Sequence, residues 1–260
     1  MYWLLLVTSG QDKINYIGHS MGGSTFFAMC SYKPVICKER VNLMVGLGTH
    51  TVLHNMMSPA MQYLAKDYGG LLGGFWFKYK FGKREFNPPP DTMRDLAALF
   101  CTTSLHAAGL CRMGIFLFVG PNDLNVSKDT LGYLMEGYPS TTSVMLIEHY
   151  LQFVDRRQWA QFDYGMMQNI LQYGSIFPPL YSLEHVTTPV ALFSSDWDMF
   201  CSSMDTKTMS MEMPYLVYEK NMNRTWYNHG DYFYNADNLE LNSIVTQLVQ
   251  YEYTVQNMEK

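Results

Sequence analysis

The residues Gly18-His19-Ser20-Met21-Gly22 place a serine between two glycines in the pattern Gly-x-Ser-x-Gly. In many hydrolases this pattern marks a sharp turn from a strand into a helix, which projects the serine hydroxyl above the sheet. We expect Gly18 and Gly22 to leave room for the strained backbone of that turn, and the Met21 backbone N–H to stabilise an oxyanion. The pattern predicts acyl transfer through Ser20, although an ordinary glycine-rich turn would use the same residue types.

A serine nucleophile needs a histidine to accept its proton and a carboxylate to orient that histidine. In α/β-hydrolases both residues follow the serine, the acid first and the histidine second. Asp196 and Asp198 follow the strand predicted at residues 186–194, and His229 lies shortly before the C-terminal helix. The chain order predicts His229 as the base and leaves two candidates, Asp196 and Asp198, for the acid.

The hydrophobic pattern indicates the elements that must position these residues. Strands are predicted at residues 13–18, 41–48, 186–194 and 216–219, and helices at residues 24–31 and 238–251. Between them, residues 52–181 carry Met and Leu at helical spacing. The sequence predicts an α/β fold of the α/β-hydrolase type, in which residues 1–51 and 182–260 form the C-terminal portion of a mostly parallel sheet and residues 52–181 form a helical cap.

The other histidines are weaker candidates for the base. One lies within the serine turn and five precede both candidate acids: His19, His50, His54, His106, His149 and His185. We expect His149 to be a packed or hydrogen-bonded residue of the cap.

The composition excludes several other classes of function. The 260-residue chain has a formal net charge of -5, so it lacks the excess of Lys and Arg that neutralises nucleic-acid phosphates. Its five cysteines show no Cys-x-x-Cys pair and no neighbouring histidine pair, so we expect no metal site, and serine chemistry needs no cofactor. No apolar run reaches the roughly 20 residues of a transmembrane helix, and residues 1–7 lack the basic residues and length of a signal peptide.

Stretches along essentially the whole chain resemble the animal acid lipases, the family of gastric and lysosomal acid lipase. They lie around the nucleophile, in the cap, before the late strand and around the base: Thr8-Ser9-Gly10-Gln11, Tyr16-Ile17-Gly18-His19-Ser20, Phe81-Gly82-Lys83-Arg84-Glu85-Phe86, His149-Tyr150, Phe162-Asp163-Tyr164-Gly165, Pro178-Pro179-Leu180-Tyr181 and Asn228-His229-Gly230-Asp231-Tyr232. The resemblance places the base at His229 and the acid at Asp198, and it matches Asp205 to an aspartate that is not catalytic.

The resemblance also implies a substrate and a destination. It implies that a secreted or lysosomal monomer hydrolyses neutral lipid esters, such as triacylglycerols or cholesteryl esters, at a lipid–water interface through an acyl-Ser20 intermediate. It implies a disulfide between Cys101 and Cys111. Export would make Asn125 and Asn223, which begin Asn-x-Ser/Thr tripeptides, sites of glycosylation.

The chain departs from the family pattern before the nucleophile, where only 19 residues precede Ser20. Family members have a signal peptide, several strands and a His-Gly-containing oxyanion loop in that region. We therefore expect an N-terminally incomplete sequence that lacks the first strands and the second oxyanion donor. Two other functions remain open: a catalytically silent lipid-binding or yolk-like protein on the same fold, and a carboxylesterase for small esters.

Overall fold

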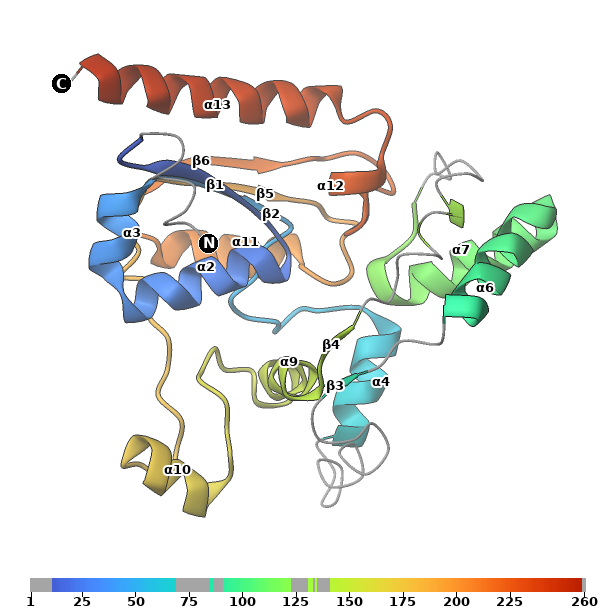
Figure 1. Ribbon diagram of the computed structural model, residues 1–260, viewed down its shortest axis with the longest axis horizontal. Helices are drawn as coiled ribbons and strands as arrows, with labels where there is room; N and C mark the ends of the chain where they lie inside the picture. The colour runs from blue at the N-terminus through green and yellow to red at the C-terminus, as the bar shows by residue number, and fades with distance from the viewer. Residues whose placement is uncertain are drawn as a thin grey trace.

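A parallel four-stranded sheet forms the centre of the molecule (Figure 1). The computed structural model describes residues 11–68, 85–86, 91–122, 131–132, 134 and 141–258. The strands follow the order β1-β2-β5-β6, with bounds β1 (Ile14–His19), β2 (Val41–Leu47), β5 (Val190–Ser194) and β6 (Leu216–Asn221). Parallel strands need crossover connections, which place helices against the faces of the sheet.

Helices lie on both faces of this sheet (Figure 1). On one face are α2 (Met21–Tyr32), α3 (Pro34–Arg40) and α11 (Ser203–Glu212), and on the other is α13 (Leu239–Met258). The short helix α12 (Asp231–Tyr234) precedes α13. The carboxyl ends of β1, β2 and β5 therefore meet at one edge, which is where α/β proteins of this kind carry their sites.

The pleat of the two central strands divides the core into two clusters. Every residue of β2 and β5 is buried, and successive side chains on a strand point to opposite faces. Met44 and Leu192 pack with Phe26, Phe27 and Met209 from α2 and α11. The alternate residues of the same strands pack with the last helix: Leu43, Val45, Ala191, Phe193 and Leu241. Burial on both faces explains why these strands have continuous apolar sequences.

The segment between β2 and β5 is mainly helical and lies at one side of the sheet (Figure 1). Its elements are α4 (Pro59–Tyr68), β3 (Glu85–Phe86), α6 (Asp91–Thr103), α7 (Leu105–Val119), β4 (Thr142–Ser143), α9 (Val144–Arg156) and α10 (Met166–Tyr173). The strands β3 and β4 form an antiparallel pair. Ser104 caps α7, because its side chain accepts a hydrogen bond of 3.1 Å from the Ala107 N–H.

Three elements differ from the sequence prediction. The helix α3 was not predicted; it begins at Pro34, because the fixed φ of proline suits the first turn of a helix. The strand predicted from residue 186 begins only at Val190, since Val186 N–H closes a turn onto the Leu183 carbonyl and Pro189 has no N–H to donate. The helix α11 was not predicted.

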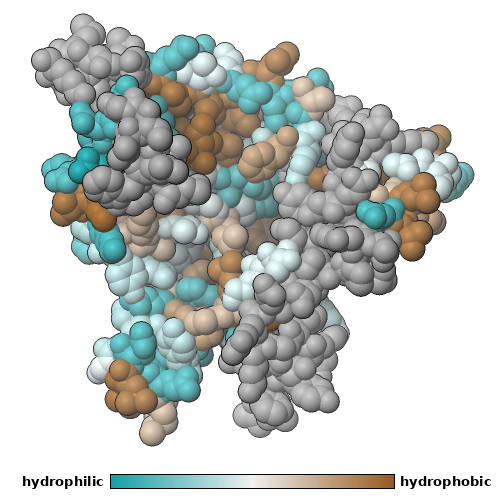
Figure 2. Space-filling model, viewed as in Figure 1, coloured by the Kyte–Doolittle hydropathy of each residue, from teal (hydrophilic) through white to brown (hydrophobic). Residues whose placement is uncertain are grey.

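Apolar side chains remain exposed on several helices of the segment between β2 and β5. On α10 they include Met167, 75% exposed, and Leu171, 86% exposed, and Figure 2 shows hydrophobic surface at the tip where α10 projects. None of the described helices is both long and apolar enough to cross a membrane.

Candidate active site

Ser20 occupies the turn between β1 and α2, and its backbone is strained. Its φ of 52° and ψ of -122° lie outside the regions that a residue with a side chain ordinarily adopts. The turn is held from both sides, because the Ser20 N–H donates to the Leu47 carbonyl at 3.0 Å and the Ser20 carbonyl accepts from the Gly23 N–H at 3.1 Å. A strained residue held in this way is typical of a functional turn.

Close packing around the turn depends on Gly18 and Gly23. A Cβ at Gly18 would lie 2.7 Å from the Gly23 backbone nitrogen, and a Cβ at Gly23 would collide with the Thr49 side chain. At Gly22 a Cβ would meet no atom within 4 Å. The expectation that Gly22 leaves room for the turn was therefore wrong: β1 and β2 crowd the neighbouring residue Gly23, and Gly22 lies on an open part of α2.

A pair of alanine substitutions tests this packing. Gly18→Ala should lower the free energy of unfolding by about 1–3 kcal/mol, because the added methyl group overpacks a site bounded by backbone atoms. Gly22→Ala should leave it unchanged or raise it by about 0.5–1 kcal/mol, because alanine favours the helix. Urea denaturation of both variants measures the difference, and equal effects at the two positions would contradict the assignment.

Ser20, His229 and Asp198 form a hydrogen-bonded chain. The distance from Ser20 Oγ to His229 Nε2 is 2.7 Å, and that from His229 Nδ1 to Asp198 Oδ2 is 2.8 Å. Asp198 is completely buried and His229 is 7% exposed. With Nδ1–H donating to the carboxylate, Nε2 is free to accept the serine proton, as a general base must.

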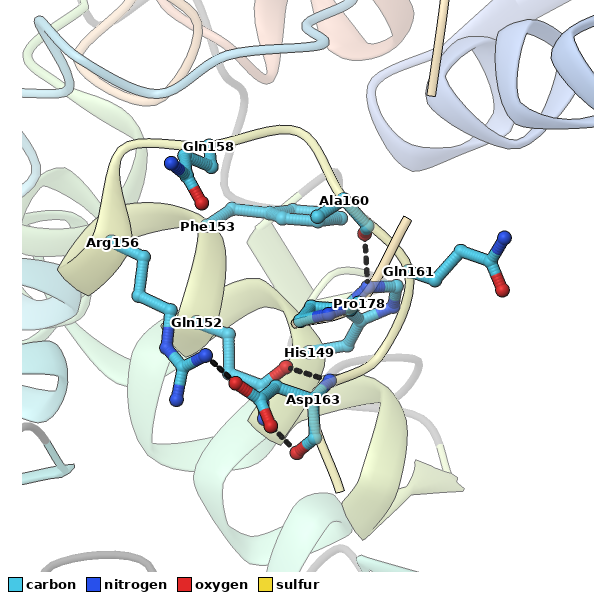
Figure 3. Close-up of a pocket in the computed structure, with 9 residues that line it drawn as sticks. All are labelled: His149, Gln152, Phe153, Arg156, Gln158, Ala160, Gln161, Asp163 and Pro178. Carbon is cyan, nitrogen blue, oxygen red and sulfur yellow. Dashed lines mark hydrogen bonds and ion pairs between the residues drawn. The ribbon is translucent and has the colours of Figure 1, made fainter. Parts of the chain in front are cut away.

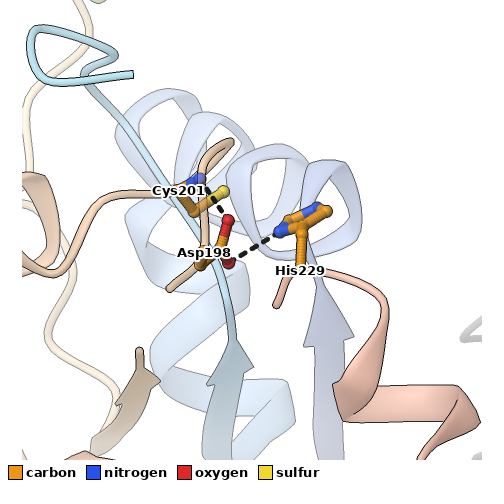
Figure 4. A group of neighbouring side chains, drawn as sticks. All are labelled: Asp198, Cys201 and His229. Atoms are coloured by element: carbon orange, nitrogen blue, oxygen red, sulfur yellow. Dashed lines mark hydrogen bonds and ion pairs between the residues drawn. The ribbon is translucent and has the colours of Figure 1, made fainter. Parts of the chain in front are cut away.

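The structure separates the two candidate acids, of which Asp198 faces His229 (Figure 4). Asp198 Oδ1 accepts the N–H groups of Phe200 at 2.9 Å and Cys201 at 2.7 Å, which leaves Oδ2 facing His229. Asp196 is exposed and accepts a hydrogen bond from Asn221 Nδ2 at 2.7 Å. The turn after β5 thus directs one carboxylate inward and the other outward.

The third aspartate of this region, Asp205, is also buried but lies in a separate network. Its carboxylate accepts the Asn55 backbone N–H at 2.9 Å and the Asn55 side-chain amide at 2.7 Å. Asp205 therefore fixes the chain after β2 and does not contact the histidine.

A metal ion has one candidate site among the described residues. One oxygen, one sulfur and one nitrogen of Asp198, Cys201 and His229 lie within 4.8 Å of one another. Burial and the nearby charge of Asp198 raise the pKa of the Cys201 thiol well above its ordinary value, whereas a metal ligand must be a thiolate. The hydrogen bonds of Asp198 already account for both its oxygens, so the group suits orientation of His229 better than metal binding.

Two further histidines lie beside the hydrogen-bonded chain of Ser20, His229 and Asp198, and the sequence did not predict either role. His19 Nε2 donates to the His229 backbone carbonyl at 2.9 Å, and the two rings lie 4.6 Å apart. His50 is buried, and its Nδ1 lies 2.9 Å from Cys201 Sγ. Burial, and then the charge of His229, lower the pKa of both His19 and His50 to about 3. Both imidazoles therefore stay neutral beside His229.

These two histidines predict that acid destabilises the fold. Their pKa of about 3 in the folded chain lies below the ordinary value of about 6.5 expected after unfolding. Between these values the unfolded chain binds more protons, so the free energy of unfolding should fall as the pH is lowered from about 6.5 toward 3. Urea denaturation at several pH values measures this slope. His50→Gln should flatten it and His54→Gln, at an exposed position, should not; equal slopes would contradict the prediction.

The Met21 amide lies at the first position of α2, directly after the nucleophile. The N-terminal end of a helix carries partial positive charge and free N–H groups, which favours an anion at this place. The backbone of Met21 is thus suited to hold one side of an oxyanion on a substrate bound to Ser20.

A small pocket that none of these residues lines lies between α9 and the loop that follows it (Figure 3). His149 Nε2 donates to the Ala160 carbonyl at 2.8 Å, and burial lowers the pKa of His149. Gln152 pairs with both the N–H and the carbonyl of Asp163, whose carboxylate forms an ion pair with Arg156. As predicted, His149 is a hydrogen-bonded structural residue.

The remaining predicted sites are a disulfide and two glycosylation sites. Cys101 and Cys111 form a disulfide between α6 and α7, and a second disulfide that we did not predict joins Cys30 and Cys37. Asn223 is exposed, so a glycan could reach it. Asn125 and two stretches of the acid-lipase resemblance, residues 8–10 and 81–84, lie outside the described residues.

Comparison with known proteins gives the family. Residues 1–210 match the family model described as alpha/beta hydrolase fold. The chain is 27% identical to the lysosomal acid lipase/cholesteryl ester hydrolase of Rattus norvegicus and to the gastric triacylglycerol lipase of Bos taurus, each over 90% of this chain and 56% of the relative. It is 26% identical to Lipase 3 of Drosophila melanogaster, over 95% of this chain and 62% of the relative.

A solved structure shares the fold at low sequence identity. The monoglyceride lipase of Saccharomyces cerevisiae, in a soluble variant, superposes with a TM-score of 0.51 at 13% identity, over 96% of this chain and 64% of that chain. The chain thus spans about 56% to 62% of the length of the curated relatives that it matches. It belongs to the alpha/beta hydrolase fold family and is related to the animal acid lipases.

Proposed function

We propose that this chain carries the catalytic centre of a serine hydrolase that cleaves neutral lipid carboxylic esters. The observation that carries the proposal is the continuous chain of hydrogen bonds from Ser20 Oγ through His229 to the buried carboxylate of Asp198. This arrangement can perform nucleophilic acyl transfer, because it combines a nucleophile, a base and a group that fixes the base.

The reaction would proceed in two steps. His229 Nε2 takes the Ser20 proton as the oxygen attacks the ester carbonyl, and the Met21 N–H helps to stabilise the oxyanion. His229 then returns the proton to the departing alcohol, which leaves an acyl-Ser20 ester. Water then attacks this ester while His229 takes one of its protons. His229 passes that proton to the Ser20 oxygen as the carboxylic acid is released, which restores the serine.

The relatives and the surface support a lipid ester as the substrate. Two of the relatives are named for triacylglycerol and cholesteryl ester, and helices between β2 and β5 expose large apolar side chains, among them Leu99, Leu105 and Met113. We infer that residues 52–181 form a cap that shields an acyl chain and contacts the lipid–water interface, and that the protein acts in the secretory pathway, outside the cell or in the lysosome.

A labelling experiment tests the proposal. A fluorophosphonate probe should label the native protein at Ser20 and should not label it after heat denaturation, because only an activated serine reacts. Absence of labelling would favour the silent lipid-binding protein. Hydrolysis of emulsified long-chain triacylglycerol faster than that of a soluble short-chain ester would support a lipase, and the reverse order would favour a carboxylesterase.

A further inference from the structure

The end of α7 is hydrogen-bonded to the loop that carries the catalytic histidine. The Val119 carbonyl accepts the His229 N–H at 3.3 Å, and the Gly120 carbonyl accepts the Asn228 side-chain amide at 2.7 Å. Asn122 Nδ2 donates to Asp231 Oδ1 at 3.0 Å. Three hydrogen bonds therefore join residues 119–122 to residues 228–231, which lie more than 100 residues further along the chain.

We propose that residues 119–122 position the catalytic histidine, and that Asn122 is the positioning residue that holds its loop. The inference rests on the hydrolase activity proposed above and extends it, since it assigns a role in catalysis to a residue that touches neither the substrate nor the reacting atoms. Asn122 acts on His229 through Asp231, which lies two residues after the histidine.

Asp231 makes the loop sensitive to its hydrogen-bond donors. Its side chain is 1% exposed, and a buried carboxylate is stable only when donors satisfy its oxygens. Oδ2 accepts the Asn228 N–H at 2.7 Å, and Oδ1 accepts the amides of Asn122 and Asn235, each at 3.0 Å. The conformation of residues 228–231 therefore depends on the positions of the residues that donate these hydrogen bonds.

The same end of α7 also contacts the loop of the catalytic acid. Gly120 has a φ of 101°, and a Cβ there would lie 2.6 Å from the Trp197 carbonyl oxygen. The Leu117 carbonyl accepts the Ser58 hydroxyl at 3.1 Å, and the Ser58 N–H in turn donates to the Met199 carbonyl at 2.8 Å. Residues 117–122 thus lie against the loops of both Asp198 and His229, and they fix the spacing on which the hydrogen bond between acid and base depends.

Asn235 provides a matched control. Its amide donates to the same oxygen of Asp231 over the same 3.0 Å as the amide of Asn122. It comes from the end of α12, four residues after Asp231, so it belongs to the same local structure as the carboxylate. If Asn122 merely satisfied a buried carboxylate, both alanine variants would have the same effect. If it joins the loop to α7, only Asn122→Ala should release His229.

The experiment compares Asn122→Ala and Asn235→Ala by hydrogen exchange and by ester hydrolysis. For Asn122→Ala, the His229 amide should exchange about 10- to 100-fold faster, the effect of losing a hydrogen bond to a charged group. Its kcat should fall by a similar factor while KM stays within about twofold, since misplaced catalytic groups slow the chemical step without weakening substrate binding. For Asn235→Ala, the changes in the exchange of the His229 amide and in kcat should both be smaller than those for Asn122→Ala.

Further arms separate the possible outcomes. Asn122→Ser, which keeps a donor, should restore part of the protection and of kcat, and it replaces Asn122→Ala if that variant does not fold. Equal effects of Asn122→Ala and Asn235→Ala on exchange would overturn the inference. If the unmodified protein hydrolyses no ester and takes up no fluorophosphonate, the proposed function fails, and the exchange measurement alone decides whether residues 119–122 hold the loop.

Discussion

Replacement of Ser20 by alanine should abolish ester hydrolysis and fluorophosphonate labelling. The Ser20 oxygen is the atom that would bond to the acyl group, and its hydroxyl lies 2.7 Å from His229 Nε2. Loss of the nucleophile of a serine hydrolase lowers kcat by about a million-fold. Titration with the probe and turnover of an emulsified triacylglycerol measure the two effects, and the free energy of unfolding should change little because Ser20 forms no part of the apolar core.

Ser24→Ala is the control for this variant. Ser24 lies one turn further along α2, and its hydroxyl donates to the His50 carbonyl. The variant removes a hydroxyl from the same helix but none that reaches His229, so labelling and turnover should persist. If Ser20→Ala kept its turnover, the assignment of the nucleophile would be wrong. If Ser24→Ala also lost it, the loss in Ser20→Ala could be a distortion of the turn.

The second large effect is expected at Asp198. Asp198→Asn should lower kcat by about 10⁴-fold, as replacement of the triad carboxylate does in serine proteases. An asparagine amide can present a donor to His229 Nδ1, which favours the wrong tautomer of the ring and leaves Nε2 protonated. Steady-state kinetics on a soluble ester should show the fall in kcat with KM little changed.

Asp196→Asn is a matched control, because it makes the same chemical change two residues earlier on the same turn. Asp196 is exposed and paired with Asn221, so this variant should keep kcat within about twofold of the unmodified protein, as expected of a surface substitution. The reverse result, a large loss at Asp196 and a small one at Asp198, would assign the acid to the other carboxylate.

Local sequence was sufficient to predict the turn that carries Ser20 and the central elements of the sheet. The Gly-x-Ser-x-Gly pattern located Ser20 at a strand-to-helix turn, which is where the structure has it, between β1 and α2. This succeeded because a sharp turn depends on the conformational range of a few adjacent residues. The continuous apolar runs of β2 and β5 were also visible, since burial on both faces removes the usual alternation.

Chain order alone could not choose between the two candidate acids. Asp196 and Asp198 follow the same strand, so position after β5 could not separate them, and the acid-lipase resemblance was needed to favour Asp198. The structure shows the physical difference: the turn buries Asp198 under the N–H groups of Phe200 and Cys201 and leaves Asp196 in solvent. The sequence shows that carboxylates follow β5, whereas only the path of the backbone shows which carboxylate points toward His229.

The sequence by itself determined the serine turn and the central strands of the sheet, because each depends on neighbouring residues. Only the tertiary structure decided which residues surround His229: His19 at its carbonyl, His50 beside Cys201, and residues 119–122 against its loop. These contacts join residues as far apart as 210 positions, and no local preference specifies them. They exist because packing of the helices against the sheet brings buried polar groups together, and each such group must find a partner there to compensate for the water it has lost.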